Sequence, residues 1–260
     1  MKSIYKKIEI SPYFLLLIFL SLISGLFKDI FSLFLIIIIH ELGHIIMSLI
    51  YKWNINKVKI NIYGGYIIYN ENIDKSFKEE FLIAISGILM QCIFYLLLYI
   101  LNKVGILDLS FLLIVKKYHY SILIFNLLPI IPLDGSKVLN VLLNKIFSYK
   151  KSLYIINSIS LLFIILFIIL LIIYKLKIEL SYVIILSFIM SSIIKNINDI
   201  PYLFNKFLFE RYKYPIKNVK TYYIKNSNIE NMRRQRINYF YINNTYKDER
   251  YLLLNRYIKL

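Results

Sequence analysis

The stretch IIIIHELGHIIM, residues 36–47, places three residues that can do chemistry within a run of isoleucines. His40 and His44 are four residues apart, so on a helix they share one face about a turn apart. Imidazoles at this spacing can bind one zinc ion, and Glu41 can reach a water on the metal. Three fixed positions also recur by chance, and in a soluble helix both histidines could be surface residues. In a membrane helix each polar group opposes insertion, which makes a metal site the better interpretation.

A second acidic residue also lies deep in an apolar stretch. Of the fifteen Asp and Glu residues, only Glu41 and Asp134 stand well inside apolar segments. An acid near a bilayer centre costs about 2.5–3.5 kcal/mol on insertion scales, so such residues are usually functional and partnered. For a lone acid the alternative is an inter-helix hydrogen bond made by the protonated form. A catalytic zinc needs a third protein ligand and an open position, and Asp134 is the candidate.

The sequence around Asp134, NLLPIIPLDGSK, predicts a distorted helix. Pro129 and Pro132 each lack an N–H and clash with the preceding turn. At membrane depth such a break is tolerated only where protein or a water-filled cavity satisfies the backbone. The remaining histidine, His119, lies fifteen residues before Asp134. That separation is about 22 Å along a continuous helix, which excludes His119 as a ligand of the same ion and predicts an interfacial residue.

The composition is that of a polytopic membrane protein. The chain is 59% hydrophobic and its mean hydropathy is +0.63, both above a soluble globular domain. The net charge is +17, and residues 195–260 hold fourteen Lys and Arg against five Asp and Glu. A basic tail of this kind is typical of the cytosolic, anionic-lipid side of a membrane. Nucleic-acid binding competes with this interpretation, and the apolar remainder of the chain argues against it. The single cysteine, Cys92, excludes an intramolecular disulfide and a cysteine-based metal site.

The hydrophobic pattern predicts an all-α polytopic membrane protein of about six transmembrane helices. The apolar segments lie near residues 12–27, 30–50, 78–101, 119–145, 152–174 and 180–195. Residues 104–115 predict an interfacial segment or a long entry into the fourth helix. No small-residue cleavage site follows the first segment, which indicates a retained helix. With both termini cytosolic, the cytosolic pieces hold eleven Lys before the tail and the opposite pieces six, which favours that orientation.

Between the second and third segments, INKVKINIYGGYIIY (residues 55–69) predicts a small β-hairpin. Apolar residues alternate with Lys and Asn, and Gly64-Gly65 is a two-residue turn signal. We expect this hairpin at the cytosolic face of the membrane. An ordinary amphipathic loop is the alternative.

HELGH in an early transmembrane segment and NLLPIIPLDG in a later one together resemble the site-2 proteases, the intramembrane zinc metalloproteases. Order, spacing and size are most similar to the bacterial sporulation stage IV protein FB branch. The resemblance covers residues from about 30 to 145. It implies one Zn²⁺ with His40, His44 and Asp134 as ligands and Glu41 as the catalytic base. It also implies that Asn126 orients the substrate or the metal site.

Two further parts of the family pattern can be placed on this sequence. The hairpin around Gly64 and Gly65 matches the family's membrane-associated hairpin, which binds an extended substrate by strand addition. AISGILMQ, residues 84–91, falls where the family has a Gly-rich motif in its third helix, often Ala-Gly-Pro. Ile88 stands in place of that Pro, so close helix packing at Ser86 and Gly87 is the simpler interpretation.

The domain organisation predicted from the sequence has two parts. Residues 1–195 form a transmembrane metalloprotease domain whose catalytic core is about 30–145, and residues 196–260 form a basic cytosolic tail. The sporulation branch usually carries a CBS-type domain at this place, which implies a degenerate or truncated CBS-like module here.

The predicted function is intramembrane hydrolysis of a peptide bond in a membrane-associated protein substrate, with no nucleic acid involved. The sporulation resemblance implies a sigma-factor precursor as substrate and membrane proteins that inhibit or activate the enzyme. The rival is a membrane protein that uses the same residues to transport metal. A transporter predicts internal repeats and polar groups along a path, and the sequence shows neither. A protease-like scaffold without activity is a third possibility, and the intact His40, Glu41 and His44 argue against it.

Overall fold

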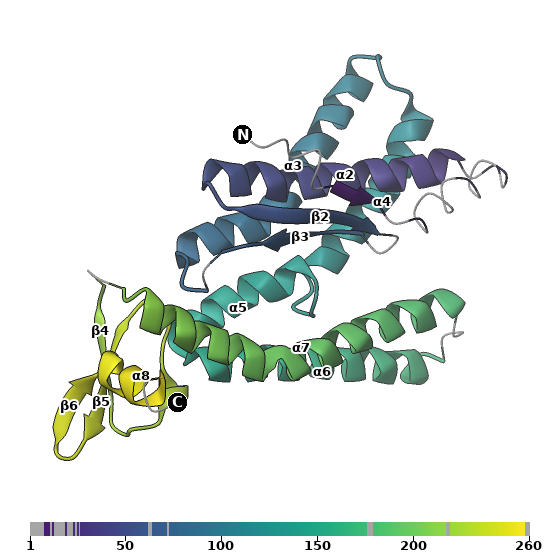
Figure 1. Cartoon of the computed structure of the whole chain (residues 1–260). Coiled ribbons are helices and arrows are strands. Elements are labelled where there is room, and N and C mark those ends of the chain that lie inside the picture. The colour runs from purple at the N-terminus through teal and green to yellow at the C-terminus, as the bar shows by residue number, and fades with distance from the viewer. Residues whose placement is uncertain are drawn as a thin grey trace. The chain divides into compact units, whose positions relative to one another are not determined.

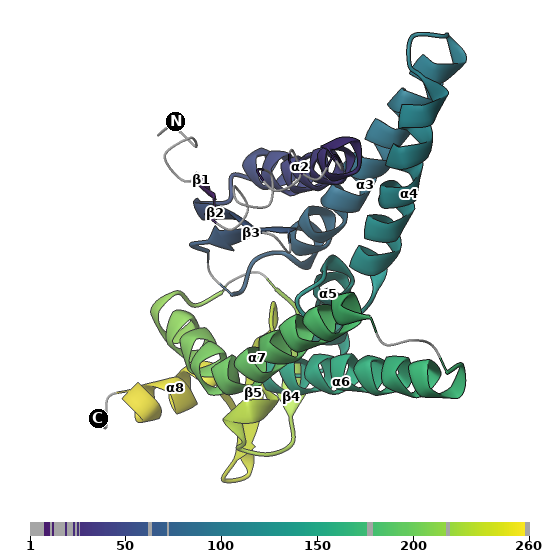
Figure 2. The ribbon, with the colours of Figure 1, turned by 90° about the vertical axis from the view of Figure 1, so that its right-hand side faces the viewer.

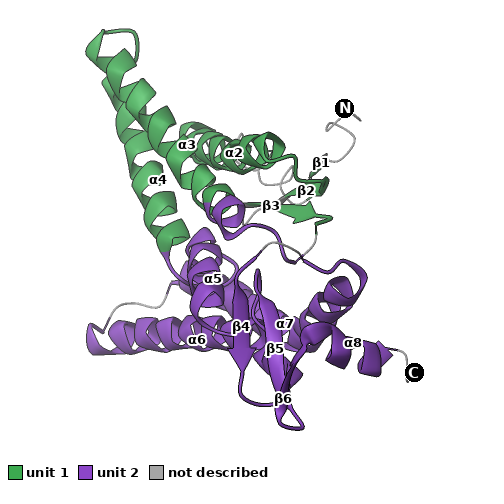
Figure 3. Ribbon diagram, turned by 90° about the vertical axis from the view of Figure 1, so that its left-hand side faces the viewer, with its two compact units in different colours: residues 1–71, 82–127 green, residues 72–81, 128–260 purple. Residues whose placement is uncertain are grey.

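The computed structural model describes residues 8–10, 12, 19, 23, 25, 27–61, 64–71, 73–175, 179–216 and 219–257. Contacts divide the chain into two compact units (Figure 3). The first unit comprises Met1–Glu71 and Leu82–Leu127, and the second comprises Asn72–Phe81 and Leu128–Leu260. One long helix begins in the second unit and continues in the first.

In its described residues, the first unit combines three helices with a three-stranded sheet (Figure 1). The helices are α2 (Phe27–Ile50), α3 (Phe77–Lys103) and α4 (Leu109–Leu127), and the strands are β1 (Ile8–Ile10), β2 (Ile55–Asn61) and β3 (Gly64–Tyr69). The three helices meet around a buried apolar cluster: Ile36, Leu98, Leu112 and Val115. This packing fixes α2 against the two helices that follow the sheet in the chain.

The sheet of the first unit has the order β1-β2-β3, with β1 parallel and β3 antiparallel to β2. Glu9 on β1 receives a hydrogen bond from Lys57 on β2 and lies 3.3 Å from the Lys59 ammonium. These two lysines hold the pKa of the Glu9 carboxyl below its usual value. One edge of β2 is therefore occupied by the chain's own N-terminal strand.

The turn predicted at Gly64-Gly65 is wrong, because both glycines belong to β3. Asn61 pairs with Gly64, and β3 runs on from there to Tyr69. The connection falls on residues 62–63, which lie outside the described residues. A glycine at residue 65 is explained instead by close contact with Glu41 of α2, which leaves no room for a side chain.

The segment predicted as one span over residues 119–145 is two helices, α4 and α5 (Asp134–Ile146). Residues 128–133 between them are not helical and contain a cis Ile131-Pro132 peptide. The two prolines explain the break, since neither can donate to a helical carbonyl. Of the two alternatives for residues 104–115, the structure has an entry into α4, which begins at Leu109 after a turn with Gly105 at φ +80°.

The second unit contains the helices α5, α6 and α7 and a small C-terminal α/β module. After α5 come α6 (Tyr149–Ile173) and α7 (Leu180–Lys213), which pack side by side (Figures 1 and 2). The module consists of β4 (Thr221–Ile224), the 3-10 helix η2 (Ile229–Asn231), β5 (Ile237–Ile242), β6 (Thr245–Asp248) and α8 (Glu249–Tyr257). Its sheet has the order β4-β5-β6, with β4 parallel and β6 antiparallel to β5.

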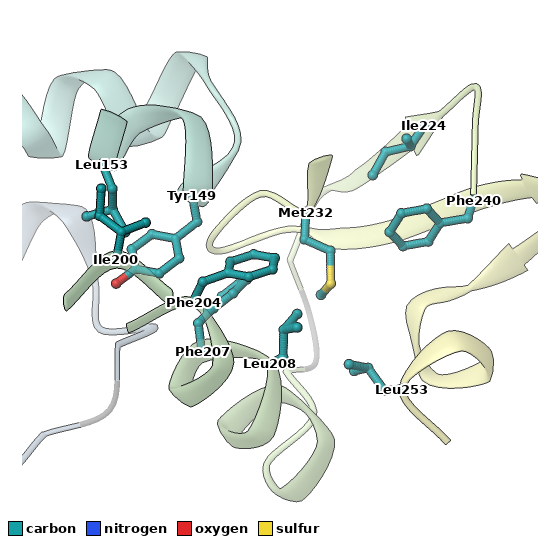
Figure 4. Close-up of a cluster of buried hydrophobic side chains, with 10 residues drawn as sticks. All are labelled: Tyr149, Leu153, Ile200, Phe204, Phe207, Leu208, Ile224, Met232, Phe240 and Leu253. Carbon is teal, nitrogen blue, oxygen red and sulfur yellow. The ribbon is translucent and has the colours of Figure 1, made fainter. Parts of the chain in front are cut away.

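The core of the second unit joins this module to α6 and α7 (Figure 4). Phe207 and Leu208 of α7 and Phe240 of β5 are fully buried. The whole cluster is Tyr149, Leu153, Ile200, Phe204, Phe207, Leu208, Ile224, Met232, Phe240 and Leu253. All four residues that α7 contributes to this cluster lie beyond residue 195, where the sequence predicts the last span to end. The helix instead continues to Lys213, so the predicted boundary at 195/196 falls inside α7.

Four helices in the described part of the chain are long and apolar enough to cross a membrane: α2, α3, α6 and α7. Most of the first predicted span, residues 12–27, lies outside the described residues. The helix α4 is 19 residues long and is not among the four. The described part of the chain is thus mostly helical and holds four candidate spans, where the sequence predicts about six for the whole chain.

A buried ionic cluster holds the start of α3 to the C-terminal module within the second unit. The Arg211 side chain is only 1% exposed and lies 2.5 Å from Asp74 and 3.2 Å from Glu249. Arg234 donates hydrogen bonds to both carboxyl oxygens of Glu80, one of them at 3.1 Å. Burial raises the pKa of the Glu249 carboxyl, and the nearby Arg211 guanidinium opposes that rise. Each charge therefore depends on its partner, because none of them is well solvated.

Replacing Arg211 should destabilise the second unit strongly. In Arg211→Met two buried carboxylates lose their partner, which typically costs about 3–5 kcal/mol. The midpoint of thermal unfolding of the purified chain in detergent, followed by circular dichroism, measures the loss. Lys206→Met is the matched control on α7, because the Lys206–Glu210 pair is partly exposed at 3.6 Å and such pairs contribute little. Equal midpoints for the two variants would contradict the prediction.

Candidate metal centre

Two histidines on α2 present ring nitrogens to the same point. His40 and His44 are 4% and 5% exposed, and their Nε2 atoms are 3.2 Å apart. The α-helical period explains the pairing, since residues four apart stack on one face. Two nitrogens bound to one zinc at about 2.0–2.1 Å with a tetrahedral angle lie about 3.3–3.4 Å apart. The observed spacing therefore fits one shared zinc ion.

The second nitrogen of each ring contacts a group on α3. His44 Nδ1 lies 2.7 Å from the backbone oxygen of Ile83, and His40 Nδ1 lies 3.2 Å from Gln91 Oε1. Both contact atoms are oxygens that can only accept, so each Nδ1 donates and each neutral ring turns an Nε2 lone pair inward. Two lone pairs at this separation repel each other, whereas a cation bound to both is attracted. The donor set thus suits a metal.

Gly87 of α3 lies directly against the two rings. A Cβ at this position would come within 2.7 Å of His40 Nε2 and would contact His44 even more closely. The helices also approach closely at Gly43, where a Cβ would lie 2.5 Å from the Ser86 oxygen. The packing at Ser86 and Gly87 expected from the sequence is present. In addition, Gly87 keeps the space next to the two ring nitrogens free of a side chain.

Glu41 is half-buried and packs against strand β3. The carboxyl carbon of Glu41 lies 2.6 Å, and its Oε2 atom 2.9 Å, from the position that a Cβ on Gly65 would occupy. Any larger side chain at residue 65 would displace the carboxyl group. The structure therefore brings together His40, His44, Glu41 and Gly65, which the sequence placed in one site.

Asp134 and Asn126 stand at helix ends. Asp134 is the first residue of α5, is 4% exposed, and lies 2.7 Å from the Lys137 ammonium through Oδ1. A carboxylate in the first turn of a helix is favoured by the helix dipole. Asn126 is half-buried near the end of α4. Asp134 belongs to the second unit and Asn126 to the first.

Two residues contribute to the site beyond what the sequence predicts, Gln91 and His119. Gln91 is fully buried and contacts both His40 and the backbone oxygen of His119. His119, expected at the interface, is 4% exposed and stacks on Tyr95 at 4.5 Å. The separation of about 22 Å predicted from the sequence requires a continuous helix from His119 to Asp134, and the helix is broken between Leu127 and Asp134. The available signal for Gln91 was the one used for the acids, a polar side chain inside an apolar segment.

Comparison with known proteins places the chain in a family, although no family model matches it. Stage IV sporulation protein FB of Bacillus subtilis (strain 168) is 30% identical over 206 residues, which cover 79% of this chain and 71% of the relative. A site-2 protease of solved structure from Methanocaldococcus jannaschii matches with a TM-score of 0.55 and 26% identity, covering 73% of this chain and 89% of that one. The chain belongs to the site-2 protease family of intramembrane zinc metalloproteases.

A further relative agrees with this assignment. Zinc metalloprotease MJ0392 of Methanocaldococcus jannaschii is 32% identical over 124 residues, 46% of this chain and 35% of the relative. The chain is thus an integral membrane metalloendopeptidase whose metal is zinc, as the sequence predicted. Of these two relatives, the sporulation protein matches the larger share of this chain.

Enlarging Gly87 should reduce zinc binding. Gly87→Ala puts a methyl group against both Nε2 atoms, so the rings must turn away or the helices must separate. We expect at least a 10-fold loss of zinc affinity, measured by competition with a chelating dye on the purified protein. Cys92→Leu is the control, since Cys92 is exposed on the same helix. Unchanged zinc affinity in Gly87→Ala would show that the rings do not face a metal here.

Proposed function

We propose that His40, His44 and Asp134 hold the catalytic zinc and that Glu41 is the catalytic base for hydrolysis of a peptide bond in a membrane-associated protein. The observation that supports this most directly is the separation of the two Nε2 atoms, 3.2 Å. Asp134 is the proposed third ligand because it offers a buried carboxylate oxygen, as the two histidines offer buried nitrogens. Three protein ligands leave the fourth position open, as a catalytic zinc requires.

The reaction divides between the metal and the chain. When bound, zinc supplies a Lewis acid that polarises the scissile carbonyl and acidifies a water molecule. Glu41 takes a proton from the attacking water and delivers it to the leaving amine. Its packing against Gly65 restricts where the carboxyl group can lie, so the proton acceptor is held in one place. Asn126 is proposed to orient the substrate or the metal site.

The sheet of the first unit supports a way of binding the substrate. Among the described strands β3 has a neighbour on one side only, because β1 occupies the far edge of β2. An extended peptide that pairs with β3 would lie beside Gly64 and Gly65, and therefore beside Glu41. Strand addition also exposes the scissile carbonyl, which a helical substrate would hide in its own hydrogen bonds. We propose β3 as the strand that receives the substrate.

The relation to stage IV sporulation protein FB supports a sigma-factor precursor in sporulation as the substrate, with membrane proteins that inhibit or activate the enzyme. We also propose about six spans, with β2 and β3 as a hairpin between the second and third, and both termini cytosolic. The basic segment 196–260 is proposed to be a cytosolic tail that holds a degenerate or truncated CBS-like module.

Glu41→Gln tests the mechanism. The amide cannot accept the proton of water, so cleavage of a co-expressed membrane substrate should fall by about 10²–10⁴-fold. Zinc content should stay at the wild-type level, because Glu41 is not a ligand. Glu9→Gln, an exposed acid on β1, should cleave normally. Retained cleavage in Glu41→Gln would refute the proposed base, and zinc flux into vesicles carrying the wild-type protein would favour a transporter instead.

Asp134→Ala tests the third ligand. Removing this carboxylate should lower zinc affinity far more than Lys137→Met, which removes only the ammonium that contacts it. Chelator competition on the purified variants provides the measurement. If Asp134→Ala binds zinc as tightly as Lys137→Met, another residue is the third ligand.

A further inference from the structure

A glutamine inside a membrane helix contacts one of the two zinc-facing histidines. Gln91 is on α3 with none of its surface exposed. A buried amide costs free energy unless its oxygen and nitrogen are both hydrogen-bonded. In the structure the oxygen contacts His40 Nδ1 at 3.2 Å and the nitrogen donates to the backbone oxygen of His119 at 2.8 Å.

These contacts determine which ring nitrogen of His40 carries the proton. The backbone oxygen of His119 can only accept, so the amide nitrogen of Gln91 must be the group that faces it. The amide oxygen then faces His40, where it too can only accept. His40 must therefore carry its proton on Nδ1, which leaves the Nε2 lone pair directed toward His44.

The position of Gln91 on α3 is part of a regular pattern. Ile83, Gly87 and Gln91 are spaced by four residues and so lie along one face of the helix. The first orients His44 through its backbone oxygen, the second leaves room for the ring nitrogens, and the third orients His40. Only the third acts through a side-chain hydrogen bond.

His119 keeps Gln91 in place. Its ring stacks on Tyr95 with the planes 10° apart, and its Nδ1 lies 3.3 Å from the Gln91 amide nitrogen. Tyr95 is four residues after Gln91, so α3 contacts His119 through both side chains. His119 of α4 thus holds the Gln91 amide in place, and the amide in turn contacts His40.

We propose that Gln91 is a positioning residue that fixes the tautomer and ring orientation of His40 for zinc, with His119 as its anchor. The inference rests on the proposed metal site and adds the group that prepares it. A zinc-bound histidine usually donates its other N–H to an acceptor, and loss of that acceptor typically weakens metal binding 10- to 100-fold.

The test compares two substitutions of similar size by chelator competition on the purified, full-length protein. Gln91→Met removes the acceptor and should weaken zinc binding 10- to 100-fold. Gln91→Glu keeps an oxygen that accepts from His40 Nδ1, so it should bind zinc more tightly than Gln91→Met. A purely structural role predicts the reverse order, because the apolar side chain is easier to bury than a carboxyl group.

Asn102→Leu is the matched control, since Asn102 is an amide on the same helix that donates to Leu107. The thermal midpoint of the metal-free variants adds a second readout that does not depend on activity. The proposal expects Gln91→Met to fold with a near wild-type midpoint without metal and to gain less from added zinc.

The outcomes separate this inference from the proposed function. Wild-type protein that binds no zinc would overturn both. If wild-type and Asn102→Leu bind zinc and Gln91→Met binds it equally tightly, only the role of Gln91 is overturned. The same holds if Gln91→Met loses stability without metal and its zinc affinity is unchanged.

Discussion

The structure of this site depends on satisfying two imidazole rings where water is scarce. A neutral histidine that binds a metal through one ring nitrogen carries a proton on the other. At membrane depth a protein group must accept the hydrogen bond from that second nitrogen. Here both accepting groups come from α3: the backbone oxygen of Ile83 contacts His44, and the side-chain oxygen of Gln91 contacts His40. Gly87 lies between them in sequence, where a side chain would fill the space in front of the rings. One helix face therefore prepares the nitrogens that another helix supplies.

Close packing also restricts the position of the Glu41 side chain. Glu41 is one residue from His40 but packs against β3, where Gly65 leaves room for its carboxyl group. The sheet thus has two consequences for the site. It confines the carboxyl group of Glu41, and under the proposal that β3 receives the substrate, an extended peptide paired with β3 would lie beside that carboxyl group. The packing against Glu41 explains why a glycine stands at residue 65, a position that is not a turn.

Sequence reasoning succeeded where a local period or an insertion cost carried the information. The pairing of His40 with His44 follows from the helical repeat, and the acids were found because polar groups oppose insertion. It failed where the contacting residue is distant in sequence, and where a local signal indicates a distortion of a helix without showing its extent. Gln91 contacts His40 across 51 residues, which no period reveals. The prolines before Asp134 predicted a disturbed helix, but not that two separate helices would result.

The helix α3 carries residues that contact the two histidines and, near its start, a residue that pairs with the C-terminal module. Glu80, near its start, forms a buried pair with Arg234, while Asp74 just before it pairs with Arg211. Ile83, whose oxygen orients His44, is only three residues after Glu80, less than one helical turn. An α-helix does not bend freely over so short a length, because its backbone hydrogen bonds span four residues. Glu80, which pairs with Arg234, and Ile83, whose oxygen contacts His44, therefore lie on one continuous stretch of α3.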